Sequence, residues 1–333
     1  MKSIADTDLK KITCDLDHLV EQYSHSKKSY IAPSRKNLGV VSIPIVREII
    51  APAVFRQEEP EPLTATVGDE EYVRVVANKL KYGERARMLQ TLRHIELGGA
   101  MPQNRSEIPG KAATGDYFDP CTYIFGDSAQ KGNRVLSVRA AASYSCALST
   151  TPEGLCVDST FHNRANEWGT LYDEVDKKNS DNLFDRVFVK PGTLLLQVIT
   201  FTGKSIPAEL LDMYLTVLGS PFMAGGQTSV YGVNVKNHVV GVFGGLFEQA
   251  INSPYELLAQ VLAHSPKAVN DPDTLSKAVF KLMADAYPTH INSGETQQLQ
   301  ETFIATINDD KTPEGWKTAK GKVADYFTKY FDK

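Results

Sequence analysis

Hydrophobic and polar residues follow one another in blocks that predict a mixture of strands and helices. The run LGVVSIPIV (38–46) is rich in β-branched residues and predicts a buried strand. The run VFVKPGTLLLQVITF (187–201) predicts a second strand, and its apolar length indicates burial on both faces. Residues 207–218 have helical spacing and end at Gly219, and a further strand is predicted up to about Phe243.

Other segments combine or change the pattern. In residues 72–97 the first half alternates like a strand, and the second half has helical spacing. Residues 121–149 predict two strands joined by a polar turn. Residues 253–264 predict a helix with a capping box at Ser253, and the next helix has Asp271 in the same position. Residues 1–30 predict a polar helix.

In order, the middle of the chain gives strand, helix, strand, strand, long insertion, strand, helix, strand. The insertion, residues 150–186, is polar and without periodicity, and segments of this kind are usually functional or disordered. Without it, the order is close to β-α-β-β-α-β, the ferredoxin-like arrangement that the RNA recognition motif also uses. The pattern therefore predicts an α+β fold of this class, followed by a helical C-terminal region at about 250–333.

Composition and charge narrow the function classes. The chain has 333 residues, of which 42% are hydrophobic and 23% charged, so we expect a packed core. Its net charge is -4, and a nucleic-acid-binding surface would have to gather its basic residues on one side. The four cysteines form no CxxC motif, and no apolar run approaches the roughly 18 residues of a membrane span. We expect a cytoplasmic protein with reduced thiols and no membrane contact.

Catalytic and metal-binding motifs are incomplete. TGKS (202–205) resembles the end of a phosphate-binding loop, but the position of the required earlier glycine is Val198. Zinc sites need close pairs of cysteine or histidine, which the chain does not offer. We therefore expect no cofactor, no metal and no catalytic residue. The residues weighed for these roles were Cys121, Cys146, Cys156, His162, Asp158, Glu167, Asp173 and Glu174.

The basic stretch from 74 to 93 allows two interpretations. One is a solvated face that pairs with the acidic loop at 58–71. The other is a track for phosphates, because Lys and Arg neutralise the backbone of nucleic acids whatever the sequence. Within it, Lys79 belongs to the strand-like part, and Arg85 and Arg87 open the helix. The cations in question are Arg74, Lys79, Lys81, Arg85 and Arg87.

The stretch PFMAGGQTSVYGVNV (221–235) between helix and strand is also ambiguous. Gly225 and Gly226 allow positive φ and a close approach of backbone N–H groups to a ligand. Short polar side chains follow, and Tyr231 is suited to stacking on a base. A plain turn uses glycine for the same steric reason. The polar residues are Gln227, Thr228 and Ser229.

Several of these segments, in this order, resemble the Cas-seven-type backbone subunit of type I-D CRISPR effector complexes (Cascade). The segments are TYIFGDSAQKGNRVLSV, NRANEWGTLYD, VFVKPGTLLLQVITFTG and GGQTSVYGVNV, which together span about 120–245; RVVANKLKYGERARML adds a weaker match. The resemblance implies a single domain over 1–333, with a palm at about 38–46, 72–147 and 187–245. It also implies a thumb hairpin within about 148–187.

The resemblance implies RNA binding by the cations above and by residues 225–229 and Tyr231. The family often has an arginine in this glycine-rich loop, whereas the nearest cation here is Lys236. Lys131, Arg134 and Arg139 would compensate. The implied thumb residues are Asn163, Glu167, Gly169 and Thr170.

The implied partners are CRISPR RNA, target DNA and possibly target RNA, head-to-tail copies of this chain, the large subunit and a Cas-five-type subunit. The first hypothesis is therefore a structural RNA-binding subunit that presents the guide for pairing. A second is a ruler-type metal-dependent nuclease, with Asp158 or Asp173 as the acid. A third is an RNA-binding protein outside CRISPR.

Overall fold

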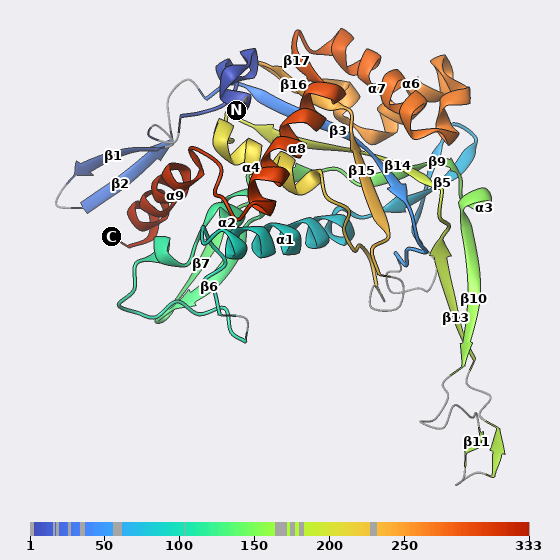
Figure 1. Cartoon of the computed structure of the whole chain (residues 1–333), viewed down its shortest axis with the longest axis horizontal. Coiled ribbons are helices and arrows are strands. Elements are labelled where there is room, and N and C mark those ends of the chain that lie inside the picture. The colour runs from blue at the N-terminus through green and yellow to red at the C-terminus, as the bar shows by residue number, and fades with distance from the viewer. Residues whose placement is uncertain are drawn as a thin grey trace.

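The computed structural model describes residues 3–15, 17, 20–25, 28–33, 37–55, 62–102, 104–163, 172–173, 177–179, 183–226 and 232–332. Its centre is a nine-stranded antiparallel sheet (Figure 1). In the sheet the strands run in the order β17 (Thr289–Asn292), β16 (Gly241–Gly245), β3 (Val40–Ile49), β14 (Leu194–Thr202), β9 (Ala147–Pro152), β5 (Glu70–Val75) and β4 (Thr64–Val67). Two shorter strands join it, β15 (Val235–Val239) on β3 and β8 (Ser143–Tyr144) on β14.

Helices cover both faces of this sheet. One face packs against α1 (Ala77–His94), α2 (Pro120–Phe125), α4 (Ala208–Leu218), α8 (Ser293–Asn308) and α9 (Trp316–Phe331). The other face packs against α6 (Pro254–His264) and α7 (Pro272–Ala286). Because β3 and β14 are buried on both sides, their sequences are almost wholly apolar, as the pattern indicated.

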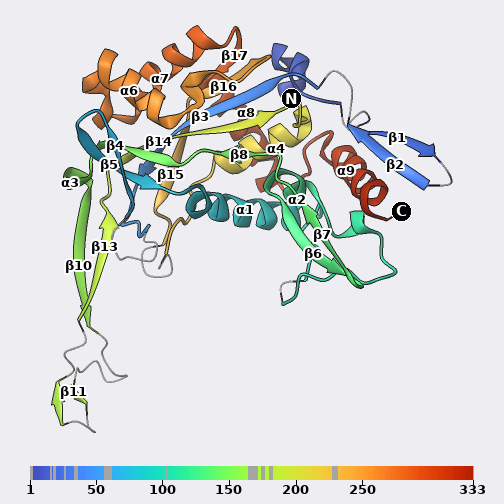
Figure 2. The ribbon, with the colours of Figure 1, turned by 180° about the vertical axis from the view of Figure 1, so that it is seen from behind.

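Three longer pairs of strands and one short pair stand outside the main sheet in the described part of the chain. The longer pairs are β1 (Val20–His25) with β2 (Lys28–Pro33), β6 (Asp127–Lys131) with β7 (Arg134–Val138), and β10 (Val157–Asn163) with β13 (Leu183–Val189). The β10–β13 hairpin extends far from the body, and the β6–β7 hairpin lies on the opposite side of α1 (Figure 2). The short strands β11 (Tyr172–Asp173) and β12 (Lys178–Asn179) pair beyond the end of the β10–β13 hairpin. The four-residue helix α3 (Glu153–Cys156) connects β9 to β10.

The predicted α+β class is confirmed, and so are the strand at 38–46 and the helices at 207–218 and after Asp271. Asp271 accepts the N–H of Thr274 at 2.7 Å, as an N-cap does. Ser253 precedes its helix but makes no side-chain cap bond, so the capping box predicted there is wrong.

Other predictions of local structure need correction. The described parts of residues 1–30 form two short 3-10 turns, Ile4–Asp6 and Asp8–Lys11, and the β1–β2 hairpin instead of a helix. Residues 121–125 lie in α2 because Asp119 caps it and Pro120 occupies its first position. The run 187–201 is interrupted by a turn at Gly192, which has φ +88°, so it forms the end of β13 and almost all of β14, which lie in different sheets.

Candidate nucleic-acid interface

Backbone hydrogen bonds hold four segments that are distant in the chain side by side, here called the ledge: residues 53–54, 189–190, 222–226 and 77–83. Ala53 and Val189, at the base of the projecting hairpin, exchange N–H···O bonds of 3.1 and 2.8 Å. The N–H of Gly226 donates to the carbonyl of Val54 at 2.8 Å, and that of Gly225 to the carbonyl of Lys79 at 3.3 Å. The glycine-rich loop therefore lies between the start of α1 and the base of the hairpin.

Two glycines allow these segments to approach so closely. Gly225 has φ +81°, and a Cβ there would lie 2.4 Å from the carbonyl oxygen of Val54. On α1, a Cβ at Gly83 would lie 2.3 Å from the carbonyl oxygen of Met223. Gly226 is different, because its φ is not positive and the nearest atom to a Cβ is 3.8 Å away. The fold thus requires glycine at position 225, whereas position 226 has room for a side chain.

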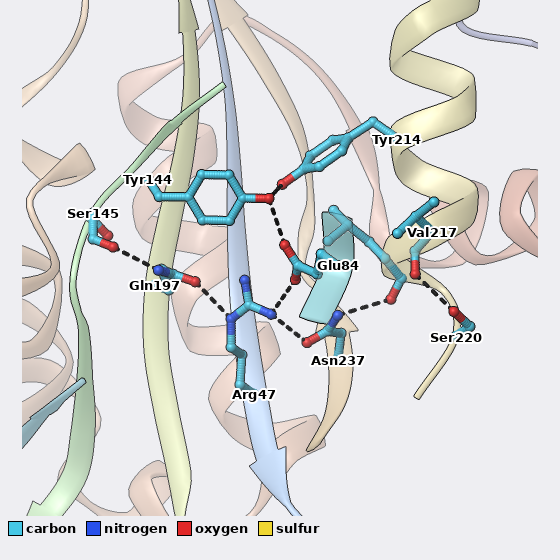
Figure 3. Close-up of polar contacts among 10 residues, drawn as sticks. Arg47, Glu84, Tyr144, Ser145, Gln197, Tyr214, Val217, Ser220 and Asn237 are labelled. Carbon is cyan, nitrogen blue, oxygen red and sulfur yellow. Dashed lines mark hydrogen bonds and ion pairs between the residues drawn. The ribbon is translucent and has the colours of Figure 1, made fainter. Parts of the chain in front are cut away.

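A buried polar network lies beneath the ledge and fixes α1 to the sheet (Figure 3). Arg47 on β3 is fully buried and pairs with Glu84 on α1 at 2.5 Å. Its Nε donates to Gln197 on β14 at 2.7 Å, and the second oxygen of Glu84 accepts the hydroxyl of Tyr144 at 2.6 Å. Tyr214 on α4 in turn donates to Tyr144 at 2.6 Å. Five elements, β3, α1, β14, β8 and α4, are therefore held in one geometry, mostly by charge-assisted bonds.

The same network reaches the glycine-rich loop. Arg47 also donates to Asn237 on β15 at 2.8 Å, and Asn237 donates to the carbonyl of Leu218, at the end of α4 (Figure 3). The guanidinium lies 5.7 Å from the ring centre of Phe222, in the ledge. Its remaining nitrogen, NH2, is buried without a partner among the described residues. The position of the ledge thus depends on one buried arginine.

Two of the predicted cations, Lys79 and Lys81, lie in the part of α1 that belongs to the ledge. Lys79 is half-buried in the first turn, and its backbone carbonyl accepts the N–H of Gly225. The ammonium of Lys81 lies 5.7 Å from the ring centre of Tyr144. Burial, and then the positive charge of Arg85, lower the pKa of Lys81. A phosphate close to the ammonium would raise the pKa of Lys81 again, because an opposite charge favours the charged form. Both residues lie in α1, and the strand-like interpretation of this part was wrong.

The next two predicted cations are engaged within the fold. Arg85 pairs with Asp127 at the start of β6 at 2.6 Å. Arg87 donates to the carbonyl of Pro221 at 3.1 Å and so ties the glycine-rich loop to α1. These side chains position the ledge, and each has a partner before any nucleic acid arrives.

Other predicted cations lie away from the ledge. Arg74 on β5 is near Cys146, on the side of the sheet that faces α6 and not on the side of α1. Lys131 pairs with Asp332 at 2.6 Å, and Arg134 donates to the carbonyl of Phe331 at 3.2 Å. These two contacts dock the β6–β7 hairpin on the end of α9. Arg139 is exposed and lines a separate pocket of about 290 Å³.

Several predicted residues lie outside the described part of the chain. These are Gln227, Thr228, Ser229 and Tyr231 of the loop, and Glu167, Gly169 and Thr170 of the thumb; the side chains of Asn163, His162 and Asp173 are not described either. Asp158 is exposed on β10, and one of its oxygens accepts the N–H of Ser159 at 2.8 Å.

The described residues contain no group of three or more metal-ligating side chains placed to hold an ion, and Cys121, Cys146 and Cys156 are free thiols. Within the same residues, no helix has both the length and the hydropathy to cross a bilayer.

Sequence reasoning missed the buried network and the exposed ring of Tyr82 on α1. Arg47 and Glu84 stand 37 residues apart, so no local pattern links them. A cation and an acid within apolar runs were the available signal, because such charges are almost never buried unless they are paired. The pattern predicted helices at 253–264 and after Asp271, but it gave no sign that they cover the second face of the sheet.

Comparison with known proteins follows from this geometry. A family model described as Csc2 Crispr matches residues 40–312, most of the chain. The chain belongs to the Csc2 family. No curated protein matches it.

Solved structures extend the comparison. The crystal structure of Thermofilum pendens Csc2 is similar with a TM-score of 0.61 at 15% identity, covering 100% of this chain and 98% of that one. The Csc2 fold therefore extends over the whole chain. Weaker matches are a chain of a CRISPR RNA-guided surveillance complex (TM-score 0.44, 11% identity, 75% and 86% covered) and one of a type IV-B CRISPR complex (0.41, 13%, 60% and 90%). With scores this low, these two carry no weight on their own.

Proposed function

We propose that this Csc2-family chain is a structural subunit that binds CRISPR RNA along the ledge and oligomerises on it. In this proposal it belongs to a type I-D Cascade-like complex in the cytoplasm and presents the guide for pairing with target DNA and possibly target RNA. Its partners would be further copies of the chain, the large subunit and a Cas-five-type subunit.

The architecture supports a palm and a thumb as parts of a single domain. The elements β3, α1, β9, β14, α4 and β15–β16 follow the ferredoxin-like order along the chain, and their strands lie in the order β16, β3, β14, β9. The projecting β10–β13 hairpin falls within the proposed thumb, residues 148–187, except for its last two residues. Because α6 and α7 cover the second sheet face, RNA would not bind there as it does on an RNA recognition motif.

The ledge is the observation that carries the proposal. It joins the base of the hairpin, the glycine-rich loop and the start of α1, and it includes Lys79 and Lys81. Neither lysine has a carboxylate partner among the described residues, and such cations, next to a backbone that approaches closely, suit the phosphates of a single strand. Sequence would then be read by base pairing and not by the protein.

The test is size-resolved binding of the purified chain to single-stranded RNAs of increasing length, at low and high salt. We expect the mass of the complex to grow in steps with RNA length and binding to weaken with salt. Lys79→Ala/Lys81→Ala should weaken binding, whereas Lys317→Ala/Lys320→Ala on α9 should not. A chain that keeps one size and ignores RNA at low salt would contradict the proposal.

A nuclease remains the second candidate, because Asp158 is exposed near the base of the hairpin, where a target strand would pass. This candidate predicts periodic target cleavage that needs Mg²⁺ and is lost in Asp158→Asn. If Asp158→Asn still cleaves the target, Asp158 is not the catalytic acid. If the target stays intact in the presence of Mg²⁺, the nuclease function is excluded and only the structural role is left.

A further inference from the structure

Tyr82 on α1 is an exposed aromatic residue without an internal role. Its side chain is 74% exposed, the same fraction as Val135, and no other described hydrophobic residue is more exposed. Within the described part of the chain, its ring contacts no other ring and its hydroxyl has no hydrogen-bond partner. Tyr330 on α9 is a useful contrast, because it is 51% exposed but packs on Tyr326 and Phe331 at 5.8 and 4.9 Å. Folding therefore accounts for the ring of Tyr330 but not for that of Tyr82.

Tyr82 has a cationic residue one turn away on either side along α1, and the residue after it is in close contact with the glycine-rich loop. Helical spacing places Lys79 one turn before Tyr82 and Arg85 one turn after it, on the same side of α1. The next residue, Gly83, is where residues 222–223 of the loop touch the helix. Met223, which is 47% exposed, follows Phe222 in that contact. The exposed ring of Tyr82 thus belongs to the residue that immediately precedes the contact between α1 and the glycine-rich loop.

We propose that Tyr82 stacks on an unpaired base of the RNA that runs along the ledge, which rests on the function proposed above. Every base has a π-face, so one aromatic ring can support any guide sequence. Lys79 and Lys81 favour RNA over a second protein as the occupant, because lysine is depleted from the centre of protein interfaces. Lys79 would then bind backbone phosphate while the ring of Tyr82 holds the adjoining base, so one turn of α1 fixes one nucleotide.

The test uses the full chain and short single-stranded RNAs that carry an abasic site or 2-aminopurine at each position in turn. Tyr82→Ala and Tyr82→Leu should weaken binding about five- to hundredfold, the range of base–aromatic stacking, and Tyr82→Phe should bind like the wild type. Tyr330→Ala is the matched control and should change nothing. At one position, removing the base should cost the wild type affinity but not Tyr82→Ala, and the fluorescence of 2-aminopurine there should be quenched only when the ring is present.

The outcomes separate this inference from the function on which it rests. If the wild type binds RNA, and Lys79→Ala/Lys81→Ala weakens binding while Tyr82→Ala does not, the stacking role is overturned and the RNA-binding function stands. If Tyr82→Ala leaves affinity for a short RNA intact but prevents growth on long RNA, the ring contacts a neighbouring copy and the inference is wrong. If the wild type binds no RNA, both fail.

Discussion

At Asp212 on α4, a carboxyl group is buried where its charged form is poorly solvated. The side chain is 3% exposed, and one oxygen accepts the N–H of Ile4 at 3.0 Å. Burial raises the pKa of Asp212 to about 8; the bond from Ile4 opposes this, and Glu209 and Asp6 add to it. Because the folded pKa lies above the unfolded one, the folded state holds an extra proton between about pH 4 and 8.

This proton gives a pH dependence with a definite sign. Stability from this group is greatest below about pH 4 and is lost as the pH rises to about 8, by up to about 1.4 kcal/mol per pH unit. Asp212→Asn keeps an acceptor for Ile4 and carries no charge. We expect it to match the wild type near pH 4 and to be more stable at pH 8, as measured by the midpoint of thermal unfolding. A wild type whose slope with pH equals that of the variant would show that Asp212 does not titrate in this window.

Gly225 and Gly226 are neighbours that the structure treats differently, and they form a matched pair. Gly225→Ala combines a positive φ with a clash on the carbonyl of Val54, so we expect a loss of more than about 1 kcal/mol in urea unfolding. Gly226→Ala has neither problem and should be close to neutral. Equal losses in the two variants would mean that the loop adjusts freely and is not held by Val54.

At the scale of elements, the Arg47–Glu84 pair connects α1 to the sheet. Glu84→Gln leaves the guanidinium buried without a counter-charge, and we expect a loss of about 3–5 kcal/mol in unfolding free energy. Arg47→Met/Glu84→Gln removes both charges and keeps an acceptor for Tyr144, so it should recover part of that loss. Arg85→Met is the control, since the Arg85 side chain is 32% exposed and such pairs contribute about 0–1 kcal/mol.

The double variant decides the cause of the loss. If Arg47→Met/Glu84→Gln is as unstable as Glu84→Gln alone, the loss comes from packing and not from an unpaired charge. If Arg85→Met loses as much unfolding free energy as Glu84→Gln, burial does not distinguish the two ion pairs. The network drawn in Figure 3 would then contribute no more to holding α1 on the sheet than a partly exposed pair does.

Helices and strands could be predicted from the sequence where the hydrophobic pattern or a capping residue was clear. They could not be predicted where contacts between residues far apart in the chain determine the structure. The apolar run at 38–46 and the cap at Asp271 were sufficient signals. Lys79 and Lys81 were placed in or near a strand-like part, yet β5 ends at Val75 and α1 begins at Ala77. The ledge itself depends on hydrogen bonds between residues far apart in the chain, which a single sequence does not reveal. Glycine content suggested the loop but could not separate Gly225 from Gly226.

At the scale of the whole molecule, an acidic protein must bind an acidic polymer. The net charge is -4 and the isoelectric point about 6.0, so the average field opposes association with RNA. Arg85 and Lys131 are already paired with Asp127 and Asp332. The proposed function therefore requires that a few unpaired cations do the binding, which makes the salt dependence of affinity a direct count of them.

Each phosphate neutralised on a single strand adds about 0.7 to the slope of log affinity against log salt. Lys79→Ala/Lys81→Ala should therefore lower the slope by about 1.4, with RNA affinity measured by anisotropy over a range of salt concentrations. Lys317→Ala/Lys320→Ala removes the same charge from α9 and should leave the slope unchanged. If the two double variants lose the same slope, the attraction is diffuse and the ledge is not a phosphate track. A selective loss would mean that an acidic subunit binds its guide through two lysines on one turn of one helix, whatever cations the rest of its surface carries.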